Sequence, residues 1–153
     1  MNVEYRPVTE GDLELLMAWR SHPKVYKNLY GQDGPLNWED HLSWWEQRSN
    51  RRDYIITIND GKRWRDVGVV ALSGLNTDRP AVGVWVGEVT LWGKGIATEA
   101  VEFAVDWLRD QGYSVATAEI SEENTSSQRV FEKAGFSRKK RVGENRIEYE
   151  QKL

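Results

Sequence analysis

A glycine-bearing turn that leads straight into a helix is the feature that most limits how this sequence can fold. The turn is Gly93-Lys94-Gly95; it follows an apolar, β-branched run over residues 81–89, and an apolar stripe at helical spacing continues from Ala97 to Leu108. Glycines let a backbone pass close to a ligand. The first turn of a helix presents unpaired N–H groups that carry about half a positive charge. Strand, turn and helix together predict a cradle for an anion such as a phosphate.

The motif fits neither of the two common nucleotide-binding patterns. It lacks the Gly-x-x-x-x-Gly-Lys-Ser/Thr spacing of the P-loop and the Gly-x-Gly-x-x-Gly spacing of dinucleotide-binding folds. The usual mononucleotide and dinucleotide sites are therefore not indicated. The alternative is a tight strand-to-helix connection that binds no ligand.

The rest of the chain alternates between strand and helix patterns. Strands are expected at residues 3–8, 54–58, 67–72, 81–89, 115–120, 136–142 and 147–152, and helices at 9–20, 37–48, 96–111 and 124–134. Residues 22–35 are expected to be irregular. In the second helix, Trp38, Leu42 and Trp45 are expected on one face and His41 and Trp44 on its flank. This order predicts an α/β fold with one mixed sheet.

Composition excludes several classes of function. The 153 residues, 39% hydrophobic and 29% charged, suit one globular domain, and a net charge of -3 argues against nucleic-acid binding. The chain has no cysteine and 2 histidines, which excludes disulfides, thiolate metal sites and a cysteine nucleophile and argues against a histidine-rich metal site. The N-terminal residues lack an apolar signal region and no apolar run is long enough to span a membrane. A cytoplasmic enzyme or binding module, without a nucleic-acid or membrane partner, is expected.

A second motif follows the glycine turn, and the two together resemble a known family. It reads Asn124-x-x-Ser127-x-x-Val130-Phe131-Glu132-Lys133-Ala134-Gly135-Phe136. The pair resembles the GNAT superfamily of N-acetyltransferases, whose signature is Arg/Gln-x-x-Gly-x-Gly/Ala. Gly95 and Ala97 match it, whereas Trp92 stands where a basic or amide residue is usual. The sequence Trp-Gly-Lys-Gly-x-Ala-Thr-Glu-Ala at residues 92–100 is typical of the branch that acetylates the N-termini of ribosomal proteins.

The resemblance implies a fold and a co-substrate. Residues 1–153 are expected to form a single N-acetyltransferase domain with a mixed sheet of about seven strands, splayed at its centre, and about four helices. Acetyl-CoA is the implied co-substrate, with no metal. Its pyrophosphate is expected on the amides of the glycine turn and its pantetheine arm along residues 81–89, like an added strand. The expected cofactor-binding residues are Val86, Gly87, Glu88, Trp92, Gly93, Lys94, Gly95, Ile96, Ala97, Thr98, Asn124, Ser127 and Arg129.

The implied chemistry needs a base, an oxyanion donor and a donor for the departing thiolate. An ordinary alkylamine with a pKa near 10 is only about one part in a thousand neutral at pH 7, so a base helps. Glu88 and Glu119 are the candidates, and a backbone amide near Gly87 is the expected oxyanion donor. Many relatives place a tyrosine at the position of Phe131, which cannot donate a proton. Ser127 is then the expected thiolate donor, unless it is simply a serine in the first turn of a helix.

The acceptor pocket is expected between the first two helices, and its candidate residues are Tyr30, His41 and Trp44. A protein N-terminus is the first candidate acceptor. The second is a nucleotide-linked amino sugar, because residues 19–25 and 39–42 resemble relatives that act on such compounds, and Arg48, Arg51 and Arg52 could hold a diphosphate. A drug or polyamine is a third. An acyl-CoA-binding domain without catalytic activity is a different class, which the missing tyrosine favours. The protein is expected to be a monomer or a homodimer.

Overall fold

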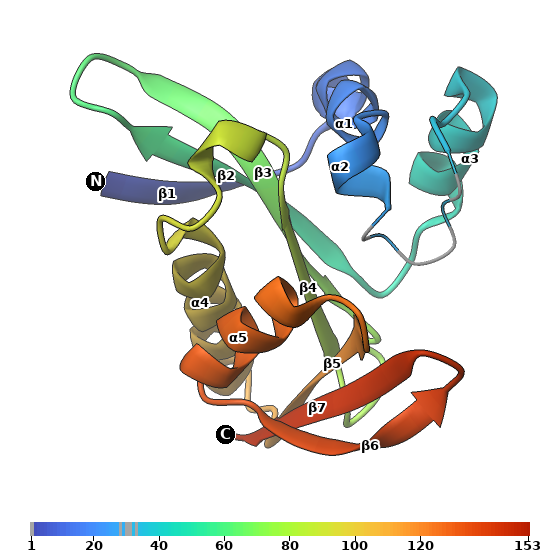
Figure 1. Ribbon diagram of the computed structural model, residues 1–153, viewed down its shortest axis with the longest axis vertical. Coiled ribbons are helices and arrows are strands. Elements are labelled where there is room, and N and C mark those ends of the chain that lie inside the picture. The colour runs from blue at the N-terminus through green and yellow to red at the C-terminus, as the bar shows by residue number, and fades with distance from the viewer. Residues whose placement is uncertain (1, 28, 30–31, 33) are drawn as a thin grey trace.

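The computed structural model describes residues 2–27, 29, 32 and 34–153 and contains one seven-stranded mixed sheet (Figure 1). The spatial order of the strands is β1-β2-β3-β4-β5-β7-β6, and every neighbouring pair is antiparallel except β4 and β5. This confirms the predicted α/β fold with a mixed sheet. The strands are β1 (Asn2–Pro7), β2 (Arg52–Asn59), β3 (Trp64–Ser73), β4 (Ala81–Val86), β5 (Val115–Ser121), β6 (Ser137–Gly143) and β7 (Arg146–Lys152).

Five α-helices in two groups accompany the sheet among the described residues. The helices α1 (Leu13–Arg20), α2 (Pro23–Tyr26) and α3 (Trp38–Gln47) gather at one end of the molecule, apart from α4 (Ile96–Asp110) and α5 (Thr125–Lys133) (Figure 1). Two 3-10 turns, η1 (Glu10–Asp12) and η2 (Val89–Leu91), precede α1 and α4. Within the described ranges none of these helices is long and apolar enough to cross a membrane.

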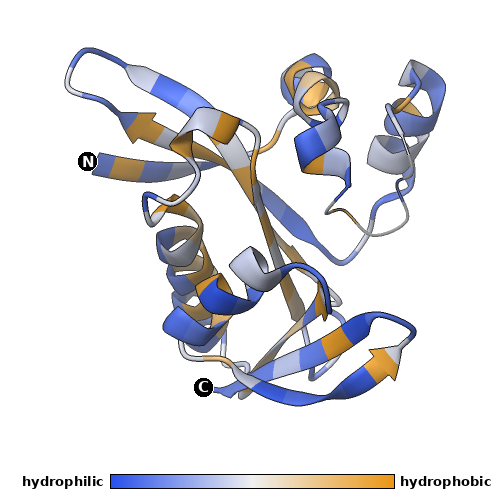
Figure 2. Cartoon of the chain, viewed as in Figure 1, coloured by the Kyte–Doolittle hydropathy of each residue, from blue (hydrophilic) through white to orange (hydrophobic). Residues whose placement is uncertain are grey.

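The core has two layers, one on each side of the sheet. Successive side chains of a strand point to opposite faces, so that Ile55 packs with α1, whereas Ile56 packs with α4 and α5. The larger layer surrounds α4, where Ala100, Val101, Ala104 and Leu108 are all 0% exposed. The apolar residues of α4 therefore form one stripe against the sheet, as the banding of this helix in Figure 2 shows.

The N-terminal helices differ from the sequence prediction in two ways. Residues 22–35 were expected to be irregular, but α2 forms there, with Pro23 in its first turn and the His22 ring accepting a hydrogen bond from the N–H of Lys24 (3.1 Å). In α3, the buried residue lies beside the predicted apolar face rather than on it. Trp38 is 43% exposed, and His41, expected on the flank, is the residue of α3 that is buried, at 1% exposed.

Candidate active site

The sheet opens between its two central strands. β4 and β5 share the single partner pair Ala81 and Thr117, while β5 pairs with β7 along its whole length. One backbone hydrogen bond at this pair runs from the N–H of Thr117 to the carbonyl oxygen of Pro80 (2.9 Å). Beyond this point β4 presents a free edge toward β5. This is the splay that the sequence resemblance implied.

A β-bulge ends the pairing of β4 with β3 and sets which amides face the opening. The N–H groups of Gly87 and Glu88 both donate to the carbonyl oxygen of Val67, at 2.8 and 3.3 Å. Because the direction of the amides alternates along an antiparallel ladder, the N–H groups of Val84 and Val86 point to the β5 side. A backbone amide near Gly87 was expected as the oxyanion donor, and the amide of Gly87 itself is bonded to β3. The slot-facing amide nearest to it is that of Val86.

Trp92 closes one end of the free edge. Its indole Nε1 donates to the carbonyl oxygen of Val86 (2.8 Å), although the side chain is 41% exposed. Trp92 thus ties the loop after β4 to the last residue of that strand. The contact explains how a tryptophan can stand at a position of the motif where a basic or amide residue is usual.

The glycine turn after Trp92 leaves its amides open. Gly93 and Gly95 have φ of 82° and 83°, and Gly95 is the N-cap residue of α4. No atom lies within 4 Å of a β-carbon built on either glycine. In the part of the chain that the structure describes, the N–H groups of residues 95–98 have no hydrogen-bond acceptor. Four free amides at the start of a 15-residue helix have the chemistry to bind an anion, the ligand that the sequence predicts for this turn.

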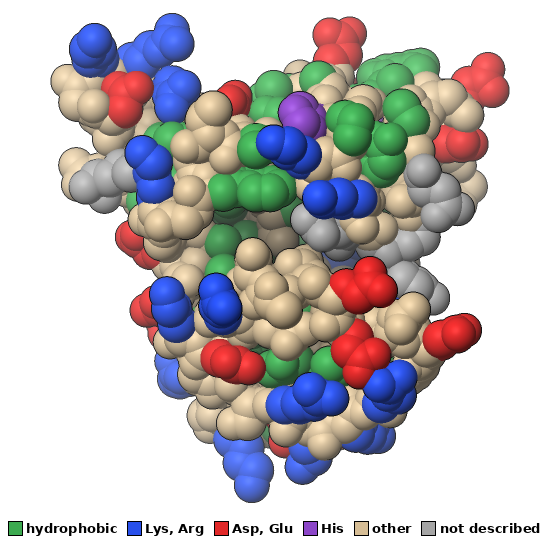
Figure 3. All heavy atoms as spheres, in the orientation of Figure 1, with side chains coloured by type: hydrophobic (Ala, Val, Ile, Leu, Met, Phe, Trp, Pro, Cys, Tyr) green, Lys and Arg blue, Asp and Glu red, His purple; other side chains and the backbone are tan. Residues whose placement is uncertain are grey.

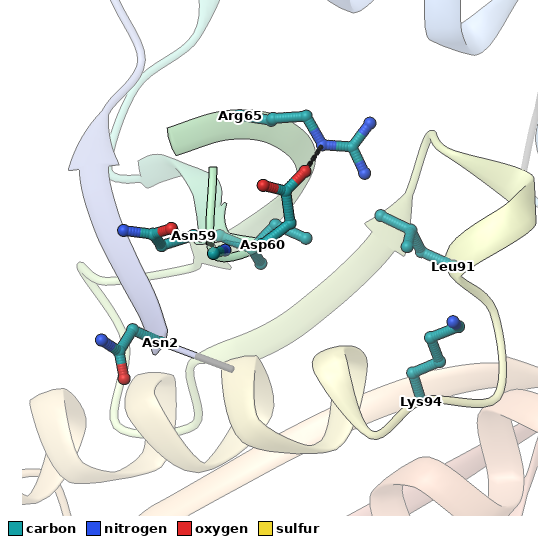
Figure 4. Close-up of a pocket in the computed structure, with 8 residues that line it drawn as sticks. Asn2, Asn59, Asp60, Arg65, Leu91 and Lys94 are labelled. Carbon is teal, nitrogen blue, oxygen red and sulfur yellow. Dashed lines mark hydrogen bonds and ion pairs between the residues drawn. The ribbon is translucent and has the colours of Figure 1, made fainter. Parts of the chain in front are cut away.

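Lys94 adds a positive charge beside the cradle. It is exposed and points toward a hollow of about 620 Å³ at the turn between β2 and β3 (Figure 4). The other residues that line this hollow are Asn2, Ile58, Asn59, Asp60, Gly61, Arg65 and Leu91. Arg65 is held there by an ion pair with Asp60 (3.3 Å). The hollow lies outside the opening between β4 and β5, so it extends the surroundings of the glycine turn rather than the splay.

The second motif forms the N-terminal end of α5, which packs against α4. The side-chain oxygen of Asn124 accepts from the N–H of Ser127 (3.1 Å), so Asn124 is the N-cap of α5. The amide nitrogen of Asn124 and the hydroxyl of Ser127 form no hydrogen bond with any described residue. Both are available to a ligand. Arg129 is exposed on the same helix.

Phe131 has a structural role. It is 2% exposed and its ring meets that of Phe136 edge to face, with the centroids 5.1 Å apart. Its position is therefore filled by a core residue.

The two candidate bases differ in their surroundings. Glu88 is half-buried at the start of η2, directly after the bulge. Glu119 lies on β5, is exposed, and accepts an ion pair from Arg146 at 3.2 Å. An ion pair stabilises the charged form of a carboxylate and ties up one of its oxygens. Glu88 has no such partner among the described residues.

On the other face of the sheet, His41 and Trp44 of α3 form one stacked unit. Their ring centroids are 5.7 Å apart and their planes differ by 9°. His41 Nε2 donates to the carbonyl oxygen of Leu13 (2.8 Å) and burial lowers the pKa of the ring, which favours the neutral form. Trp44 is half-buried at the surface between α1 and α3. Tyr30, the third predicted acceptor residue, lies outside the described residues.

Figure 3, in the orientation of Figure 1, shows that the hydrophobic side chains visible on this face gather mainly over the upper half of the molecule. The contacts described above join three pairs of predicted residues: Val86 with Trp92, Asn124 with Ser127, and His41 with Trp44. Within the described residues, no group of three or more histidines or carboxylates is placed to hold a metal ion.

Known proteins similar to this chain include one archaeal relative. An uncharacterized protein of Methanocaldococcus jannaschii is 47% identical over 148 residues, which is 97% of this chain and 31% of that protein. The chain thus spans about a third of the length of the curated relative that it matches. The crystal structure of a domain from Methanocaldococcus jannaschii has a TM-score of 0.97 and 46% identity, with 99% of each chain covered.

More distant structures share the fold. An aminoglycoside acetyltransferase in complex with coenzyme A has a TM-score of 0.84 at 21% identity and covers 99% of this chain and 95% of its own. A spermidine N-acetyltransferase from Vibrio cholerae, in complex with CoA and spermine, has a TM-score of 0.80 at 16% identity and covers 98% and 95%. The family model for the acetyltransferase (GNAT) domain matches residues 2–137. With this match, the opened sheet and the glycine turn at the start of α4, the chain belongs to the GNAT acetyltransferase family.

Proposed function

We propose that this chain is an N-acetyltransferase that moves the acetyl group of acetyl-CoA to a primary amine. The observation that carries the proposal is the free edge of β4, which ends beside the open amides at the start of α4. An edge strand with unpaired amides binds an extended chain of amides, and a helix N-terminus binds a pyrophosphate. The pantetheine arm and pyrophosphate of coenzyme A have these two chemistries, in that order along the molecule.

Each part of the site then has a role in binding. The N–H group of Val86 pairs with the pantetheine arm, and the free amides of residues 95–98 hold the pyrophosphate. Asn124 donates its free amide to the arm from the opposite side of the opening. Lys94 and Arg129 supply positive charge near the phosphates.

The chain's own groups also serve the transfer. Acetyl-CoA supplies the acetyl group as a thioester; the amine nitrogen forms a bond to the carbonyl carbon, and the bond from that carbon to sulfur breaks. The amide of Val84, which faces the opening farther from the cradle than Val86 does, stabilises the charge that develops on the carbonyl oxygen. Glu88, or Glu119 from across the opening, takes the proton that the amine loses. Ser127 donates a hydrogen bond to the departing thiolate.

Because the sequence of residues 92–100 resembles that of the ribosomal-type branch, the proposed acceptor is a protein N-terminus. A nucleotide-linked amino sugar or another small amine is the alternative. The solved neighbours named above include enzymes for an aminoglycoside and for spermidine, so the fold serves several amines. A domain that binds acyl-CoA without turnover is the competitor from another class.

The test is release of free thiol from acetyl-CoA. Because the chain contains no cysteine, a thiol reagent reports coenzyme A without a background from the protein. The amines to compare are N-terminal peptides, amino sugar nucleotides, polyamines and aminoglycosides. We expect thiol release that depends on one of these amines. Binding of acetyl-CoA without release on any of them would instead support the domain without turnover.

A further inference from the structure

Positive charge is in excess between α1, α3 and the start of β2. The carboxylate of Asp53, only 2% exposed, accepts two hydrogen bonds from Arg51 (2.9 and 2.7 Å) and one from Arg48 (3.2 Å). Arg20 is a third guanidinium beside them: its Cζ lies 5.8 Å from the centroid of Trp44, and that of Arg51 lies 5.4 Å from the same ring. One carboxylate thus faces three cations.

The Arg20 guanidinium is hydrogen-bonded through Nε, while its two terminal nitrogens are open. Its Nε donates to the side-chain oxygen of Gln32 (3.3 Å), and Gln32 in turn donates to the carbonyl oxygens of Arg20 (2.6 Å) and Gly34 (2.9 Å). Gln32 is itself 9% exposed, so this clamp is part of the packed structure. The two terminal nitrogens of Arg20 have no hydrogen-bond partner in the described ranges.

An unpaired guanidinium in this position is costly to the protein alone. Burial and the neighbouring charge of Arg51 lower the pKa of Arg20, and Asp53 only partly opposes them. A guanidinium nevertheless stays protonated, because its pKa lies far above neutral pH. An anion that accepts hydrogen bonds from the two open terminal nitrogens would compensate this charge.

The position of Arg20 connects it to the acceptor side rather than to the cofactor phosphates. The preceding residue, Trp19, packs with Trp85 of β4 at a centroid distance of 5.8 Å. Gly83 lies on the same face of β4 as Trp85, is exposed, and has no atom within 4 Å of a built β-carbon. Open space therefore lies over β4 on the α1 side. The glycine turn belongs to α4, whose apolar stripe packs on the opposite face of the sheet.

We propose that Arg20, with Arg51 as a second charge and Trp44 as a wall, binds an acidic group of the amine acceptor. The inference rests on the proposed function, since it describes the second substrate of the same site. The shared chemistry is a carboxylate or a phosphate on the molecule that carries the amine. Either group can accept two parallel hydrogen bonds from the terminal nitrogens of a guanidinium.

The first experiment compares matched acceptors at saturating acetyl-CoA. Glucosamine 6-phosphate against glucosamine tests a phosphate, and the dipeptide amide Ala-Asp against Ala-Asn tests a carboxylate. In at least one pair we expect kcat/KM for the acidic member to be about tenfold higher or more, as charge-assisted hydrogen bonds are the stronger class. The pair that shows the preference identifies the source of the anion. Equal rates within both pairs overturn the proposal.

Variants assign the preference to Arg20. Arg20→Gln should reduce the ratio of kcat/KM values to near one, mainly through KM for the acidic acceptor, with KM for acetyl-CoA unchanged. Arg20→Lys, which keeps the charge but loses the planar fork, should retain part of the preference and serves if Arg20→Gln does not fold. Arg138→Gln, on the exposed edge strand β6, is the control and should change nothing. A preference that survives in both Arg20 variants overturns the proposal.

A binding measurement separates this inference from the proposed function. With the cofactor site filled by coenzyme A and ionic strength held constant, calorimetry with pyrophosphate and with succinate should show binding that weakens about tenfold in Arg20→Gln. Anion binding that depends on Arg20, without thiol release on any amine, would contradict the enzyme and keep the anion site. If thiol is released without a preference for acidic acceptors, and no anion binding depends on Arg20, the enzyme proposal is kept and the anion site is contradicted.

Discussion

Trp19 of α1 lies against the backbone of Gly87, so closely that a β-carbon at position 87 would stand 2.2 Å from Cγ of the indole. Gly87 is the first residue of the bulge that ends β4, and its N–H is bonded to Val67. Neither partner can retreat easily, because Trp19 is 7% exposed and packs with Trp85. This contact fixes α1 against the end of β4.

Gly87→Ala should therefore destabilise the fold. Overpacking of this kind costs about 1–3 kcal/mol of the free energy of unfolding, which urea titration measures. Gly83→Ala, on the preceding strand β4, is the matched control, since a β-carbon there meets no atom within 4 Å, and it should cost less. Trp19→Leu combined with Gly87→Ala should recover part of the loss, because the smaller side chain makes room. Equal stability of the two alanine variants would contradict the contact.

Gly95→Val should weaken binding of acetyl-CoA and lower stability. The left-handed φ of 83° costs a residue with a β-carbon about 1–2 kcal/mol, and a β-branched one at least that much. The space around a β-carbon at this position is empty, so the effect comes from backbone strain and from blocking the approach of the ligand, not from an internal clash. Calorimetry should show a dissociation constant raised about tenfold or more, equivalent to about 1.4 kcal/mol.

Two further variants interpret that result. Gly95→Asn, which tolerates left-handed backbone, should fold better than Gly95→Val. Gly143→Val, at an open position on β6, should leave cofactor binding unchanged. An unaltered affinity in Gly95→Val would remove the phosphate cradle from the model of the site.

Ser127→Ala should lower turnover more than it weakens binding of acetyl-CoA. The N–H of residue 127 still reaches Asn124 in the variant, so the helix cap is kept and only the hydroxyl is lost. A group that acts on the leaving thiolate contributes mainly in the transition state, and general acid catalysis typically contributes about 10²-fold or more. Ser126→Ala, an exposed neighbour, is the control. Turnover within about twofold of wild type would leave Ser127 as a helix residue only.

Asp12 should make stability depend on pH at the acid end. Two hydrogen bonds from Arg6, at 2.9 and 2.8 Å, and one from the N–H of Thr9 (2.8 Å) hold the pKa of Asp12 below its usual range, although desolvation opposes them. Because the folded pKa is the lower one, this stabilisation is complete above the unfolded pKa of about 3.9 and is lost as pH falls through the folded value.

Asp12→Asn should accordingly cost about 1–2 kcal/mol at pH 7, in the range of a lost helix cap and a charge-assisted hydrogen bond. Urea titrations at pH 7, 5 and 3 should show the gap to wild type narrowing below about pH 4. Asp106→Asn, whose carboxylate is 72% exposed in its pair with Arg109, should have a small effect at every pH. A gap for Asp12→Asn that stays constant down to pH 3 would contradict the ion pair.

Much of this fold could be predicted where a short stretch of sequence sets its own structure. The helix after Gly95 follows from an apolar stripe and a left-handed cap, and the start of α5 follows from an asparagine three residues before Ser127. The end of α5 at Gly135, with φ of 104°, is of the same kind. In each case the residues that decide the conformation are neighbours in the chain.

Features that depend on distant partners could not be predicted in this way. His41 is buried, and its Nε2–H donates a hydrogen bond to the carbonyl oxygen of Leu13, 28 residues away; its place on the flank of the apolar face did not predict this burial. The N–H of Gly87 donates to the carbonyl oxygen of Val67, and no local sequence pattern predicts this hydrogen bond. Arg51, a candidate for a diphosphate by its sequence, is committed to Asp53, whereas Arg20 keeps an open fork because Gln32 holds its other side.

The single link between β4 and β5 also makes the sheet two mechanical units. Residues of β1–β4 form one continuous ribbon and those of β5–β7 another, and the apolar contacts of α4 hold both, through Val82 and Val86 on one side and Ala116, Ala118 and Ile120 on the other. Apolar packing is not directional, so we expect the connection between the two ribbons to resist rotation less than a fully hydrogen-bonded ladder would. A molecule that fills the opening would contact both ribbons. We expect the protein with such a molecule bound to unfold in one cooperative step, whereas the protein alone can open first between β4 and β5.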